Sequence, residues 1–165
     1  MSELLSLGRL LLFVTLLLPW LPPGVGAQQA DPSQTAAALM EEARRTDDAV
    51  TFARSIASLV RRAHEVSSEW RAVTELLSEF AGGADPVKRA IAVDAVKSLP
   101  AVARSAMVSP LSRMAERTPD GPTTRLYVRG LAETGEAGLQ ALRRLLQGGR
   151  LTGDAASLAR FYLRG

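Results

Sequence analysis

A six-residue segment near the end of the chain repeats a segment 35 positions earlier, and this recurrence limits the fold more than any other feature. Residues 125–130, RLYVRG, return as residues 160–165, RFYLRG, with four identities and two exchanges between apolar residues. The same step backwards from Leu126 reaches another aliphatic residue, Ile91. A period of this length, with two helices in each unit, is typical of α-solenoid repeats.

The apolar residues recur at helical spacing, and no convincing run alternates apolar and polar residues as a strand does. We therefore expect an all-α protein whose helix ends are marked by capping residues, prolines and glycines. The expected helices run from Asp31-Pro32 to about Arg45, through 47–80, from Asp85-Pro86 to Leu99-Pro100, onward to about Arg117, from the turn at 118–122 to about Thr134-Gly135, and from Glu136 to Gln147.

Two places within these helices leave alternatives open. Between residues 49 and 80 the apolar residues keep a seven-residue spacing, which fits one long helix with a coiled-coil-like seam. The same stretch fits equally well two helices broken near Ser67-Ser68, since serines cap helices. Ser109-Pro110 predicts an interruption or a kink, because proline has no main-chain N–H to donate.

Residues 1–27 have the pattern of a secretory signal peptide. Residues 10–18, LLLFVTLLL, are apolar apart from Thr15, prolines follow them, and Val25 and Ala27 occupy the −3 and −1 positions of a cleavage site. We therefore expect cleavage after Ala27 and export to a periplasmic, cell-envelope or extracellular location. The alternative is an uncleaved membrane anchor over residues 4–21. We expect the protein to be attached to a membrane only if this segment is not cleaved.

Residues 28–165 are expected to form a single domain, because no long linker or run of like charge divides them. Residues 28–84 form its helical N-terminal half, which fits the repeat period poorly, and residues 85–165 carry the repeats of about 35 residues. The chain contains no cysteine, so an exported domain must fold without disulfides.

The composition excludes several kinds of site. Without cysteine and with one histidine, the chain has no thiolate or multi-histidine metal site. His64-Glu65 matches only half of a zincin motif, because Ser68 stands where the second histidine would be. The net charge of +3 is a weak field for nucleic-acid binding. We expect no enzyme, no cofactor, no metal and no nucleic-acid partner.

Residues 85–96, DPVKRAIAVDAV, resemble the Asp-Pro-then-Val opening and the Ala-rich first helix of HEAT units. The resemblance to the HEAT and armadillo-like class of helical repeats covers roughly residues 85–165. It implies antiparallel helix pairs stacked as a short α-solenoid after the signal peptide. It also implies a protein-binding or scaffold module, and it carries no catalytic residue.

Four arginines one repeat apart predict a basic face: Arg125, Arg129, Arg160 and Arg164. The members of each pair are four residues apart and share one side of a helix, nearly opposite Tyr127 and Leu131. We expect this face to bind an anion, such as acidic lipid, polysaccharide or an acidic partner, or else to be a solvated surface neutralised by Glu133 and Glu136.

The last helix predicts an edge interface through its apolar residues Leu158, Phe161, Tyr162 and Leu163. Position 165 corresponds to Gly130, which lies inside a helix of the preceding unit, so we expect the final unit to be incomplete. Packing against the 139–146 helix would bury one face of the last helix. The remaining apolar strip is expected either to meet a protein partner or a second copy of the chain, or to be buried within the monomer.

If the N-terminal pattern is a cleaved signal peptide, mass spectrometry of the native protein will find an N-terminus at Gln28, with or without cyclisation of that residue. A membrane-bound protein that still begins at Met1 would contradict cleavage and support the anchor.

Overall fold

The computed structural model describes residues 35–164, and in this part of the chain every regular element is a helix. The eight α-helices described are α2 (Ala36–Arg45), α3 (Ala49–Glu65), α4 (Trp70–Ala81), α5 (Pro86–Ala95), α6 (Ala101–Arg117), α7 (Pro122–Glu133), α8 (Glu136–Gln147) and α9 (Gly153–Tyr162), with a short 3-10 helix η1 (Val96–Ser98) after α5. The prediction of an all-α fold is confirmed for these residues. The predicted signal peptide, residues 1–27, lies outside the described residues.

Short acidic or hydroxyl side chains begin several helices. The Asp85 carboxylate accepts hydrogen bonds from the main-chain N–H groups of Val87 and Lys88, at 2.8 and 3.1 Å. The bonds from the N–H groups of Lys88 and Val87 lower the pKa of the Asp85 carboxyl. The predicted start at Asp31-Pro32 lies outside the described residues. Within them, α2 begins after Thr35, whose hydroxyl caps it.

The ambiguous stretch at 49–80 is two helices, α3 and α4, separated by a turn at 66–69. The break falls at the predicted serines, but their predicted capping role is wrong, because the N-cap of α4 is Glu69. The Arg62 guanidinium donates to both Glu69 carboxylate oxygens, at 2.9 and 2.8 Å, and lowers the pKa of that carboxyl. His64 lies in the last turn of α3, and its Nε2 is 2.8 Å from the carbonyl oxygen of Ser98. This contact connects the end of α3 with the end of η1.

Helix α6 runs without a break through Pro110, so of the two predicted alternatives the interruption is wrong and the kink stays a prediction. The buried side chains of Met107 and Leu111 on either side of the proline hold both halves of the helix in the core. This packing outweighs the local cost of proline. Because Pro110 has no N–H, the Ala106 carbonyl lacks the donor that an ordinary helix would supply.

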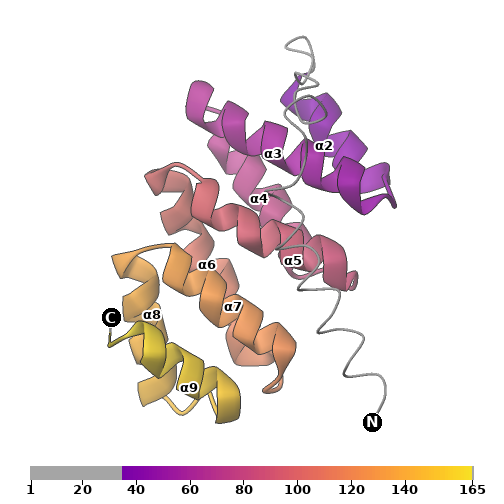
Figure 1. The fold of residues 1–165 in the computed structure, drawn as a ribbon. Coiled ribbons are helices and arrows are strands. Elements are labelled where there is room, and N and C mark those ends of the chain that lie inside the picture. The colour runs from indigo at the N-terminus through magenta and orange to yellow at the C-terminus, as the bar shows by residue number, and fades with distance from the viewer. Residues whose placement is uncertain (1–34, 165) are drawn as a thin grey trace, which may run out of the picture. The chain divides into compact units, whose positions relative to one another are not determined.

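The helices lie in two layers. Helices α3, α5, α7 and α9 contact one another in chain order, and α4, α6 and α8 do the same behind them (Figure 1). The core lies between the layers, and its largest fully buried side chains include Phe52, Leu59, Leu77, Met107, Leu111, Leu131 and Leu142. Phe52 meets Phe80 edge to face at 4.7 Å between ring centroids, so these two rings of the 49–80 stretch belong to the core.

Six polar contacts between neighbouring segments have sequence separations of 34 or 35 residues. They join Arg44 to Glu79, His64 to Ser98, Arg89 to Thr123, Asp94 to Arg129, Glu116 to Arg150 and Asp120 to Asp154. The first of these contacts lies within the N-terminal half, which was predicted to fit the period poorly, and the second joins that half to the C-terminal one. The contacts therefore extend the spacing found at the C-terminus over the described residues.

Two glycines let α7 approach its neighbours closely. A Cβ on Gly130 would lie 2.6 Å from Val93 Cγ1 of α5. A Cβ on Gly138 of α8 would overlap the Leu131 carbonyl oxygen and Thr134 Oγ1 at the end of α7. The overlap at Gly138 is with main chain, which cannot rotate away as a flexible side chain can.

We expect Gly138→Ala to lower the free energy of unfolding by about 1–3 kcal/mol, because α8 must move off α7 to make room for the methyl group. Urea denaturation followed by circular dichroism measures this change. The matched control is Gly121→Ala, since Gly121 has an extended backbone and the atom nearest its added Cβ is 3.9 Å away. Equal stability of the two variants would contradict the close approach.

Candidate functional site

The predicted basic face is partly neutralised. Arg125 Nη1 lies 2.9 Å from Asp154 Oδ2, and Arg129 Nη2 lies 3.7 Å from Asp94 Oδ1. The carboxylates therefore come from α9 and α5, on either side of α7, and not from the predicted Glu133 and Glu136. Glu136 instead pairs with Arg143, at 3.1 Å.

Other parts of this prediction are confirmed. Tyr127 and Leu131 are buried on the opposite side of α7, and the Tyr127 hydroxyl donates to the Ala81 carbonyl oxygen at 2.7 Å. Burial raises the pKa of this phenol. Arg160 and Arg164 are exposed, and their side chains form no hydrogen bond or ion pair with the residues described. The unpaired charge of this face is therefore confined to the pair near its C-terminal end.

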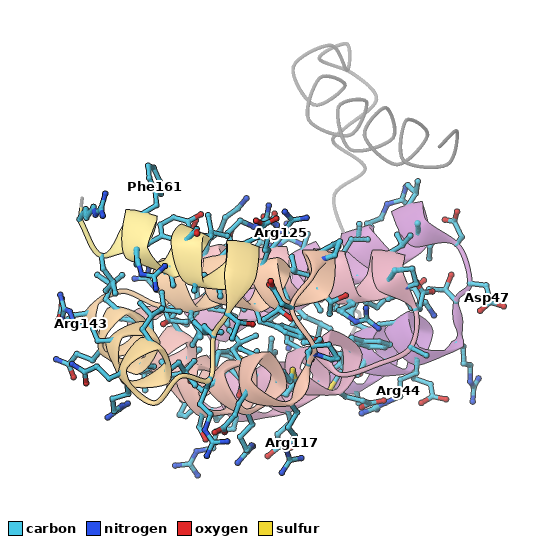
Figure 2. All side chains as sticks on the ribbon, turned by 90° about the horizontal axis from the view of Figure 1, so that it is seen from below. Arg44, Asp47, Arg117, Arg125, Arg143 and Phe161 are labelled. Carbon is cyan, nitrogen blue, oxygen red and sulfur yellow. The ribbon has the colours of Figure 1, made fainter. Side chains whose placement is uncertain are left out.

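The predicted edge interface narrows to one aromatic ring. Leu158, Tyr162 and Leu163 are partly buried and pack against the core. Phe161 is 70% exposed and meets the Tyr162 ring at 5.6 Å between centroids. Figure 2 shows Phe161 projecting from the same side of the domain as Arg125. A dimer through this edge stays a prediction.

A groove of about 450 Å³ lies between α4 and α6, in the layer of helices that does not contain α9. Thr74, Glu75 and Ser78 line it from α4, and Pro110, Arg113 and Arg117 are among the residues that line it from α6. Arg117 lies on the side of the domain away from Phe161 and Arg125 (Figure 2). The sequence analysis did not identify this groove.

The hydroxyl groups on the α4 wall donate to main-chain oxygens. Thr74 Oγ1 donates to the Arg71 carbonyl oxygen at 2.8 Å, and Ser78 Oγ donates to the Thr74 carbonyl oxygen at 2.7 Å. Both hydroxyl protons are therefore engaged within α4. Their oxygens can still accept hydrogen bonds, and the side chains that could donate to a ligand in the groove are the two arginines.

Charge of both signs is unpaired in the groove. Arg113 and Arg117 are exposed, lie four residues apart on α6, and make no hydrogen bond or ion pair with residues 35–164. Glu75, on the opposite wall, also forms none with that part of the chain. Like charges four residues apart repel slightly in a helix, so the proximity of Arg113 and Arg117 does not itself stabilise α6.

The described residues offer little else for chemistry. Residues 35–164 contain no group of three or more side chains that could hold a metal ion. Among the same residues, no helix has the length and apolar character that spanning a membrane requires. The spacing of Arg113 and Arg117 was visible in the sequence, but their position across from Glu75 depends on the packing of α4 beside α6.

We expect the double change Arg113→Gln and Arg117→Gln to alter the free energy of unfolding by less than about 0.5 kcal/mol, because neither side chain has a partner to lose. Tyr127→Phe is the positive control. It leaves the buried Ala81 carbonyl without its donor and should cost about 1 kcal/mol or more. A double variant as destabilised as Tyr127→Phe would show that the two arginines serve the fold.

No protein-family model matches this chain, and no curated protein or solved structure matches it either. No family is therefore assigned to it, and the geometry of the described residues has to support the function. In that geometry, the groove between α4 and α6 combines unpaired charges of both signs with a main-chain carbonyl that lacks its usual donor.

Proposed function

We propose that the chain is an exported, non-catalytic helical-repeat protein that binds protein partners in the groove between α4 and α6. Two observations support the repeat interpretation, which is that of a short HEAT-like α-solenoid. Helices alternate between two layers, and polar contacts between them recur at separations of 34 or 35 residues. Helical repeats of this kind expose extended surfaces to proteins. The export part of the proposal is supported by the signal-peptide pattern of residues 1–27.

The unpaired charge in the groove is the observation that carries the binding proposal. Elsewhere in the domain Arg44, Arg125 and Arg150 each have a carboxylate oxygen within 3.2 Å from another segment. The exposed Arg160 and Arg164 have none among the described residues, but they do not line the groove that contains an acidic residue. Arg113 and Arg117 have none, although Glu75 lines the same groove. A partner that carries complementary charges would satisfy all three groups at once.

The alternative function predicted from the sequence, anion binding by an arginine-rich face, is less well supported. Arg125 and Arg129 already have carboxylate partners, which leaves Arg160 and Arg164 as the unpaired half of that face. These two arginines are also four residues apart and exposed. They therefore provide a control that matches the groove arginines in charge and spacing.

We expect the mature protein to enrich peptides from a random displayed library, and the charge-reversed variant Arg113→Glu with Arg117→Glu to lose that enrichment. Deep sequencing of the selected pools measures both. The matched control Arg160→Glu with Arg164→Glu should enrich the same peptides as the unchanged protein.

Two outcomes would contradict the proposal. Failure of the unchanged, folded protein to enrich any peptide would argue against a peptide-binding groove. Enrichment that survives the Arg113 and Arg117 reversal but disappears with the Arg160 and Arg164 reversal would move the binding surface to the C-terminal edge.

A further inference from the structure

We infer that the groove between α4 and α6 takes an extended acidic peptide segment with acidic side chains at alternate positions. The inference rests on the proposed function, because it specifies the chemistry of the partner at the same groove. It follows from three features of the groove, which are the spacing of its arginines, a main-chain carbonyl beside Pro110 that lacks its usual helical donor, and the charge of its opposite wall.

The spacing of the arginines selects an alternating pattern. Arg113 and Arg117 lie on one continuous helix, so four residues separate them by about 6 Å along its axis. Side chains two residues apart on an extended peptide point the same way and are about 6.6 Å apart. A peptide lying along α6 can therefore place one carboxylate on each guanidinium, where charge-assisted hydrogen bonds are short and strong. Adjacent acidic residues would point to opposite sides of the peptide.

The main chain of α6 provides an acceptor in the same groove. Ala106 and Pro110 both line it, and the Ala106 carbonyl has lost its helical donor because Pro110 carries no N–H. An extended peptide has unpaired main-chain N–H groups along both edges. One of them can donate to the Ala106 carbonyl while the acidic side chains reach the arginines.

The opposite wall distinguishes a peptide from a polyanion. Glu75 faces the groove from α4 without a partner among residues 35–164, so a ligand that is uniformly negative would bring like charges together. A nucleic acid strand or an anionic bilayer surface has this uniform charge. A peptide can present acidic side chains to α6 and a main-chain N–H or a basic side chain to Glu75.

Fluorescence anisotropy with short synthetic peptides tests this inference. We expect a peptide containing Glu-Ala-Glu to bind the mature protein about tenfold more tightly than one containing Gln-Ala-Gln, and more tightly than one containing Glu-Glu-Ala. Arg117→Gln should weaken the Glu-Ala-Glu peptide about tenfold and leave the Gln-Ala-Gln peptide unchanged. Arg160→Gln is the matched control and should change neither. Pro110→Ala, which restores the helical donor to Ala106, should weaken every peptide that binds.

The outcomes separate this inference from the proposed function. Peptides that bind at the groove without preference for Glu-Ala-Glu would overturn the inference and leave the protein-binding function standing. No binding by any peptide, together with no enrichment from the displayed library, would overturn both. Tighter binding of oligothymidylate or of phosphatidylserine vesicles than of the Glu-Ala-Glu peptide, lost in Arg117→Gln, would assign the groove to a polyanion instead.

Discussion

The described domain depends on the burial of apolar helix faces in a core between two layers, and polar contacts at separations of 34 or 35 residues accompany this packing. Each helix buries its apolar stripe against a neighbour in its own layer and against helices in the other layer, and no disulfide fixes these positions. A shift of one turn would separate Arg44 from Glu79 and His64 from Ser98. Gly130 and Gly138 add a steric condition, because α7 can approach its neighbours only where a Cβ is missing.

The sequence predicted helices best where both ends carry their own stop signals. Gly135 and Gly148 bracket α8, and its predicted limits agree with the structure. The sequence did not distinguish one long helix from the pair α3 and α4, because a seven-residue apolar spacing fits both. The interruption predicted at Pro110 was wrong for a different reason. The local cost of proline is visible in the sequence, while the burial of Met107 and Leu111 that outweighs it is a tertiary effect.

The candidate site was predicted less well than the fold, since it depends on which carboxylate reaches which arginine. The pairs at 125 and 129, 113 and 117, and 160 and 164 have the same spacing in the sequence. The pair at 125 and 129 forms ion pairs with acidic residues of α9 and α5. The other two pairs form no ion pair with the described residues. Glu75 is 38 positions from Arg113, so only the packing of α4 beside α6 places them in one groove.

The contact between Asp120 and the start of α9 has a consequence for local opening. Its carboxylate accepts from the main-chain N–H groups of Asp154 and Ala155, each at 3.2 Å, so a side chain from the turn before α7 completes the first turn of α9. Those two amide protons can exchange with solvent only when this contact breaks. Hydrogen exchange at the beginning of α9 therefore reports on the contact that Asp120 makes from the turn at residues 118–122.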